Sequence, residues 1–235
     1  MTQAPVEQKK TTAWQMYRAI VGIGAFCAIL IVGVYMATAP QIKINQERFL
    51  ASAVSEVLPA AVLTQAVALD DDGQLVVVEE NADLPAFLGY DAEGNLVGAV
   101  MTSEAMGYQD IVRVLYAYTF ENQAITGMKV LETKETPGLG DKVEKEPHFL
   151  ANFEALDARP AADGSGLANE IVTVKQGEKT EPWQLDGITG ATITSVAIGH
   201  ILNISAQVWV PVLEREARAI TPPQPPAPQE PTEEE

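Results

Sequence analysis

An apolar run near the N-terminus constrains the fold of this 235-residue chain more than any other feature. Residues 19–39 read AIVGIGAFCAILIVGVYMATA and contain no charged side chain. As a helix, about 20 residues rising about 1.5 Å each would span roughly 30 Å, the thickness of a bilayer's hydrocarbon core. Trp14, Tyr17 and Tyr35 lie near the ends of the run, where interfacial aromatic residues are expected. We predict one transmembrane helix over residues 19–39.

A cleaved signal peptide is the alternative, because residues 37–39 (Ala-Thr-Ala) match an A-x-A cleavage site. The apolar region of a signal peptide is usually about 7–15 residues long, which is shorter than this run. Pro40 would also directly follow the cut. A retained anchor in contact with lipid is therefore favoured.

Charges beside the anchor predict its orientation. The polar head, residues 1–18, contains Lys9, Lys10 and Arg18, whereas the segment after the anchor mixes basic and acidic side chains. Positive residues next to a span stay mostly on the cytoplasmic side. We expect a cytoplasmic N-terminus and a single-pass protein whose main domain is extracytoplasmic.

Net charge and cysteine content exclude several functions. The formal net charge of −17 at pH 7 argues against nucleic-acid binding and against attraction to an anionic membrane surface. Cys27 is the single cysteine, so disulfides within the chain and cysteine-ligated iron–sulfur or zinc sites are excluded. We assign His148, His200 and all other residues to no metal site. Redox chemistry would need an organic cofactor.

Turn signals in the middle of the chain predict antiparallel strands. Residues 70–73 (DDDG) and 90–95 (YDAEGN) each precede a short apolar run, which is typical of hairpins. Residues 111–120 alternate in polarity, and residues 125–131 return after a short polar connection. The acidic cluster at 70–72 lacks the remaining ligands of a calcium loop, so we interpret it as a turn.

The last apolar segment, residues 193–213, is long enough for a second membrane span. His200, Asn203, Ser205 and Gln207 interrupt it, and polar residues are costly inside a bilayer. We therefore predict a core helix, which together with the hairpins indicates an α+β fold with an antiparallel or mixed sheet and flanking helices.

The chain is predicted to have five parts. After the head (1–18) and anchor (19–39), an amphipathic stalk helix at 40–64 follows a break near Pro40. The stalk either faces partner subunits or packs on the domain; both alternatives stay open. The α+β domain covers 65–216, and the Pro- and Glu-rich tail at 217–235 is predicted to be disordered.

Small and hydroxyl side chains gather where the last helix begins, at residues 186–195 (DGITGATITS). The first N–H groups of a helix lack partners and its dipole is positive there, so the stretch suits an anion such as phosphate. A simple capped helix without a ligand is the alternative. Glycine and alanine would let a phosphate approach the backbone, and the hydroxyls would bind it. The candidates are Thr189, Gly190, Ala191, Thr192, Thr194 and Ser195.

A second candidate element is the ETPGLG sequence at residues 135–140. Thr136-Pro137-Gly138-Leu139 predicts a type II turn, because Pro presets φ and Gly supplies a positive φ. As a binding loop, its glycines would allow backbone contact with a flat ring. Leu139 would cover the ring's apolar face, and Glu135 and Thr136 would meet its polar edge. The candidates are Glu135, Thr136, Pro137, Gly138, Leu139 and Gly140.

The sequence Asp186-x-x-Thr189-Gly190-Ala191-Thr192 matches the flavinylation signature Asp-x-x-Ser/Thr-Gly-Ala-Thr of bacterial FMN-binding domains. From about residue 13 to about 218 the chain resembles the G subunit of Rnf-type ferredoxin:NAD oxidoreductase complexes. It is also similar in architecture to the C subunit of the Na+-translocating NADH:quinone oxidoreductase.

The resemblance implies specific residue roles. Thr192 would carry FMN through a phosphoester bond made by a separate flavin transferase, and Asp186 would belong to the cofactor-binding set. The 135–140 loop would lie against the isoalloxazine ring. Thr133 stands where many G subunits carry His, so a role of that His in tuning the flavin is not carried over to this chain.

The resemblance also implies a function: an electron-relay subunit of an ion-translocating oxidoreductase in the cell inner membrane, not catalytically complete alone. Its partners would be the complex's other membrane and iron–sulfur subunits. The chain has no Gly-rich dinucleotide fingerprint of its own, which fits a relay role. Alternatives are an anchored FMN domain of another extracytoplasmic electron-transfer chain, the quinone-reductase C subunit, or a non-enzymatic membrane-anchored scaffold.

Overall fold

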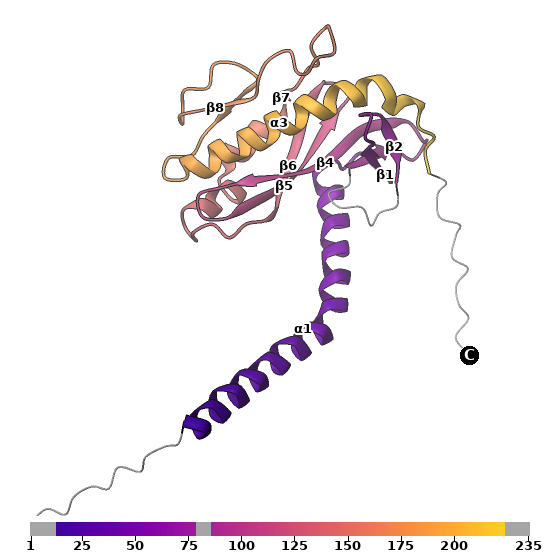
Figure 1. Cartoon of the computed structure of the whole chain (residues 1–235). Coiled ribbons are helices and arrows are strands. Elements are labelled where there is room, and N and C mark those ends of the chain that lie inside the picture. Colours follow the sequence, from indigo (N-terminus) through magenta and orange to yellow (C-terminus); the bar gives the residue numbers. More distant parts are fainter. Residues whose placement is uncertain (1–12, 79–85, 224–235) are drawn as a thin grey trace, which may run out of the picture. The chain divides into compact units, whose positions relative to one another are not determined.

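The structure is a computed structural model that describes residues 13–78 and 86–223 (Figure 1). Residues 1–12 of the predicted head and 224–235 of the predicted tail lie outside the described residues. The chain divides into two compact units, and the boundary follows Phe49.

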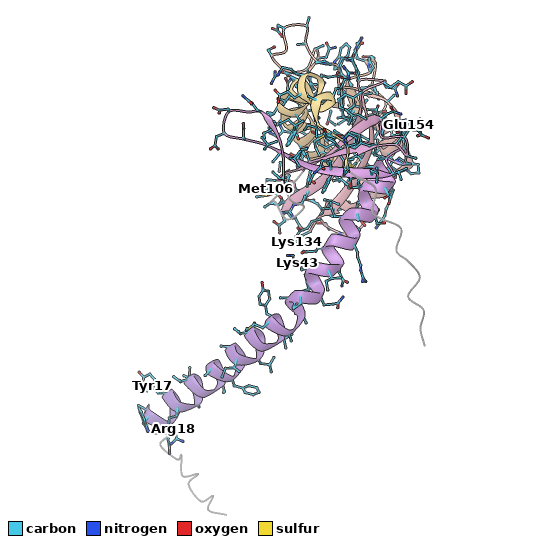
Figure 2. The ribbon with its side chains drawn as sticks, turned by 90° about the vertical axis from the view of Figure 1, so that its right-hand side faces the viewer. Tyr17, Arg18, Lys43, Met106, Lys134 and Glu154 are labelled. Atoms are coloured by element: carbon cyan, nitrogen blue, oxygen red, sulfur yellow. The ribbon has the colours of Figure 1, made fainter. Side chains whose placement is uncertain are left out.

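Helix α1 covers Ala13–Val57 without interruption, so the predicted anchor and most of the predicted stalk form one helix. Pro40 lies inside it, where we expected a break. Proline removes one helical hydrogen bond, but its fixed φ near −65° is compatible with helical backbone. Figure 2 shows the side chains along α1 from Tyr17 and Arg18 onward. The apolar side chains of the anchor are exposed in the first unit, as expected for a helix that contacts lipid.

A seven-stranded antiparallel sheet forms the centre of the second unit in the described part of the chain. All three predicted hairpins are confirmed, as the pairs β1–β2, β3–β4 and β5–β6. The strand order is β2-β1-β3-β4-β5-β6-β7. The strands are β1 (Leu63–Leu69), β2 (Leu75–Val77), β3 (Ala86–Tyr90), β4 (Leu96–Met106), β5 (Ile111–Thr119), β6 (Ala124–Glu132) and β7 (Leu156–Asp157).

Two helices cover the two faces of this sheet. Helix α3 (Thr192–Glu216), yellow in Figure 1, lies along one face, and its Ile201 is buried in one core with Tyr116 of β5. The last turns of α1 cover the other face, where Val57 is buried with Leu115. Successive residues of β5 thus face opposite cores, as side chains alternate along a strand. Because more than half of the apolar part of α3 is buried, the predicted core helix and the α+β fold are confirmed.

Short elements fill the segment between β6 and α3. They include β8, which matches a short strand predicted at residues 171–175, and its parallel partner β9, which the sequence does not predict. The elements are η1 (Gly140–Glu144), α2 (Pro147–Leu150), η2 (Ala151–Glu154), β8 (Val172–Val174) and β9 (Gln184–Asp186); η3 (Ala217–Ala219) follows α3.

Candidate functional site

Both predicted site elements line one cavity of about 320 Å³. Its walls come from three segments: the β4–β5 turn, the loop that follows β6, and the start of α3. Cavities of this size lie in the range typical of small-molecule sites. The lining residues are Tyr108, Glu135, Thr136, Leu139, Gly140, Gly190, Ala191, Thr192, Ile193 and Thr194.

Thr192 is the first residue of α3 and has an exposed side chain on the cavity wall. Among the residues that the structure describes, its Oγ1 makes only a long hydrogen bond of 3.4 Å, to the carbonyl oxygen of Ile188. The preceding residue, Ala191, provides no side-chain cap, and the first turn contains no acidic residue. The hydroxyl therefore lies at the positive end of a 25-residue helix and is accessible to a reactant.

The hydroxyls of Thr194 and Ser195 are buried and already hydrogen-bonded. Thr194 Oγ1 donates to Glu135 Oε2 at 3.1 Å. Ser195 Oγ donates to the carbonyl oxygen of Ala191 at 2.9 Å and accepts from the N–H of Ile188 at 3.2 Å. Ser195 thus closes the turn ahead of α3 and lies outside the cavity lining, although we expected it in the binding set.

Thr189 and Gly190 form the exposed corner of the signature. The N–H of Thr189 donates to Gln176 Oε1 at 3.0 Å, and the residue does not line the cavity. Gly190 does line it and has φ +85°, a conformation that favours glycine. Of the predicted hydroxyl candidates, only Thr192 is both exposed and on the cavity wall.

Glu135 connects the three walls of the cavity. The side chain is 7% exposed, and its Oε1 accepts from the N–H groups of Tyr108 at 2.7 Å and Gln109 at 3.1 Å. Its Oε2 accepts from Thr194. A Cβ on Gly140 would overlap Glu135, so glycine is required for the loop to close around the carboxylate. Both carboxylate oxygens have protein partners, which gives Glu135 a structural role in addition to its place on the wall.

The predicted type II turn is confirmed at residues 136–139. The N–H of Leu139 donates to the carbonyl oxygen of Thr136 at 3.1 Å, and Gly138 has φ +81°. Pro137 and Gly138 make the turn itself and lie outside the cavity lining. The turn presents Leu139, which is 50% exposed, to the cavity.

The η1 helix holds this turn and adds a cation that the sequence analysis missed. Asp141 Oδ1 accepts from the N–H of Gly138 at 2.6 Å. The hydrogen bond from Lys145 lowers the pKa of the Asp141 carboxyl, so it is ionised at neutral pH. Lys142 lies between Asp141 and Lys145 in sequence. Its Nζ is 3.6 Å from the position that a Cβ on Gly190 would occupy. The two segments are far apart in sequence, so no local pattern indicates their proximity.

Asp186 lies outside the cavity lining and positions the strand that leads into the signature. The carboxylate is buried; Oδ1 accepts from the N–H of Gly177 at 2.6 Å, and Oδ2 lies 2.8 Å from His148 Nε2. Asn152 bonds both the N–H and the carbonyl oxygen of Asp186, at 3.0 and 3.1 Å. His148, for which the sequence predicts no site, pairs with the first residue of the signature.

Comparisons with known proteins give matches that include the residues of this site. The family model described as "FMN-binding domain" matches residues 107–207, which include all three walls. The chain is 34% identical to the G subunit of the ion-translocating oxidoreductase complex of Methanosarcina acetivorans, and the match covers 78% of this chain and 87% of that protein. This chain belongs to the G-subunit family of ion-translocating oxidoreductase complexes.

A further relative agrees with this assignment, and a solved structure agrees with the fold. The G subunit of the Na+-translocating ferredoxin:NAD+ oxidoreductase complex of Acetobacterium woodii is 31% identical over 66% of this chain and 70% of its own length. A solved structure of the C subunit of the Na+-translocating NADH-quinone reductase from Parabacteroides distasonis is similar in fold. That likeness has a TM-score of 0.55 at 20% identity and covers 72% of this chain and 94% of the other.

The cavity of this G subunit has features that suit both the phosphate and the ring of FMN. The start of α3, without an acidic residue in its first turn, suits the phosphate. The rim offers apolar side chains to a flat ring: Tyr108, Leu139 and Ile193 are 63%, 50% and 55% exposed. Exposed apolar side chains around a concave site are typical of ligand-binding surfaces. As a G subunit with an FMN-binding domain, the chain is a redox subunit of a multi-subunit translocase.

Proposed function

We propose that this G subunit is an electron relay whose FMN is attached through its phosphate to Thr192. The observation that carries the proposal is the contrast among the hydroxyls of the signature. Thr192 Oγ1 is exposed on the cavity wall, whereas Thr194 and Ser195 are buried in hydrogen bonds. Thr189 is exposed but lies off the wall.

The attachment would form one bond to phosphorus and break another, with loss of the hydroxyl proton. Thr192 Oγ1 bonds to the phosphorus of a flavin nucleotide, the hydroxyl proton departs, and the group that the phosphorus carried in the donor leaves. A separate flavin transferase catalyses this exchange. The product keeps about one negative charge, which the start of α3 stabilises by roughly 0.3–1 kcal/mol.

The remaining site residues orient the flavin. Tyr108, Leu139 and Ile193 would contact the ring with apolar surface, and Thr136 and Gly140 complete the loop wall. Glu135 keeps the three segments together. The bound flavin supplies reversible uptake and release of electrons, and the protein sets its position and surroundings.

The relay works within a membrane complex. Residues 19–39 of α1 anchor the chain as a single span, the N-terminus is cytoplasmic, and the FMN-binding domain (65–216) lies outside the cytoplasm. The exposed apolar side chains of the anchor and the basic predicted head support this arrangement. Electrons pass between this flavin and the other membrane and iron–sulfur subunits of the complex.

In-gel fluorescence tests the attachment. The full chain, produced in a host with an active flavin transferase, is expected to give a fluorescent band under ultraviolet light after denaturing electrophoresis. Thr192→Ala should abolish the band, whereas the matched exposed hydroxyl variant Thr189→Ala should keep it. A fluorescent Thr192→Ala band would refute the site, and a dark wild-type band would favour the scaffold alternative.

A further inference from the structure

Two positive features lie at the Gly190 corner of the cavity. One is the start of α3, where the first-turn N–H groups have no helical acceptor and no acidic residue follows. The other is the Lys142 ammonium, 3.6 Å from the Cβ position on Gly190, two residues before Thr192. Gly190 and Thr192 both line the cavity, so the ammonium approaches the wall that also carries the hydroxyl that we propose is esterified.

The Lys142 side chain makes no hydrogen bond or ion pair with the residues that the structure describes. Its neighbours on η1 are already engaged: Lys145 Nζ lies 2.8 Å from Asp141 Oδ2, and Asp141 Oδ1 holds Gly138. An unpaired ammonium beside a helix N-terminus is repelled by the dipole unless an anion lies between the two. The ammonium and the dipole therefore both favour an anion at the Gly190–Thr192 corner, because the carboxylate that lines the cavity, Glu135, is engaged by Tyr108, Gln109 and Thr194.

We propose that Lys142 binds the phosphate of the flavin, donating from Nζ to the oxygens that do not bridge to Thr192. Lys142 would bind the phosphate of the incoming nucleotide before attachment and pair with the diester afterwards. This inference rests on the proposed function and adds a residue to it. The ligand class is a flavin bearing a phosphate; riboflavin, which lacks one, would gain nothing from Lys142.

The geometry also explains why this lysine, and not its neighbour, has the role. Lys142 is half-buried beside the cavity, whereas Lys145 is exposed and committed to Asp141. Gly190 has no side chain, which leaves the backbone bare between the ammonium and the cavity. Lys145→Gln is therefore a matched control that removes one positive charge from the same short helix.

The first test measures the rate of attachment. The detergent-purified full chain is incubated with a flavin transferase and its flavin nucleotide, and incorporation is followed by intact mass. Lys142→Gln should slow the initial rate roughly tenfold, the factor that corresponds to about 1.4 kcal/mol for a charge-assisted hydrogen bond. Lys142→Arg should restore most of the rate, and Lys145→Gln should match the wild type.

The second test removes the transferase. In the full chain with Thr192→Ala, the affinities for FMN and riboflavin are compared by quenching of flavin fluorescence. FMN should bind more tightly, Lys142→Gln should remove most of that preference, and Lys145→Gln should leave it. Equal FMN preference in the two lysine variants, or no preference for FMN at all, would overturn the role of Lys142. A wild-type chain that accepts no flavin from the transferase would instead refute the proposed function.

Discussion

At the scale of single residues, burial separates side chains that hold the site from those that are open to chemistry. Glu135 was expected at the polar edge of the flavin, but its carboxylate bonds two main-chain N–H groups and the Thr194 hydroxyl. Asp186 likewise bonds Gly177 and His148. The two acidic residues of the predicted site thus hold neighbouring segments in place through hydrogen bonds, whereas Thr192 is exposed on the cavity wall.

Glu135→Ala is expected to destabilise the domain by about 3 kcal/mol, because it leaves the buried Thr194 hydroxyl and two main-chain N–H groups without their acceptor. Thermal unfolding of the detergent-solubilised full chain measures this. Glu132→Ala is the control, since Glu132 is exposed and its contact with Arg113 is 3.6 Å long; it should cost less than about 1 kcal/mol. Equal losses in the two variants would contradict the structural role of Glu135.

At the scale of elements, local patterns predicted the parts whose partners are close in sequence. The hairpins at 70–73 and 90–95, and the type II turn at 136–139, follow from turn chemistry within a few residues. The burial of α3 follows from the polar residues that interrupt its apolar run. These features could be predicted because each depends on its own residues.

Contacts between distant segments could not be predicted in this way. The approach of Lys142 to Gly190 and the pairing of His148 with Asp186 join segments on separate elements. The parallel pairing of β8 with β9 likewise joins two segments that are apart in sequence, and β9 is only three residues long, too short for a periodic signal. The sequence also predicts a break near Pro40, but Pro40 lies inside α1, because the fixed φ of proline is compatible with a helix.

The turn that presents Leu139 can be tested with matched glycines. Gly138 and Gly164 both have positive φ, +81° and +72°, and a Cβ on either would meet open space. Alanine at each should therefore cost about 1 kcal/mol of strain. Only Gly138→Ala should also slow flavin incorporation, measured by intact mass over time. If Gly164→Ala slowed it equally, the turn would have no specific role in flavin binding.

At the scale of the whole molecule, the family assignment and the anchor place the flavin domain in a membrane-bound redox complex. Since one span separates the predicted head from the domain, the two should lie on opposite sides of the membrane. A flavin on the outer face would exchange electrons with partners there or within the membrane.

Cysteine labelling tests this topology. In a Cys27→Ser background, which removes the single native cysteine, a cysteine replaces either Asp163 in the exposed 163–165 loop or Thr2 in the head. A membrane-impermeant maleimide should label Asp163→Cys on intact spheroplasts and Thr2→Cys only after permeabilisation. The reverse pattern would contradict the predicted orientation.

Fragment mass spectrometry of the peptide that contains residues 186–195 tests the central claim most directly. The full chain from a flavin-transferase-competent host is digested, and fragment ions locate any added mass. We predict an increment of one FMN less one water on Thr192, with Thr189, Thr194 and Ser195 unmodified. An unmodified peptide, or the flavin on any other residue, would contradict the account.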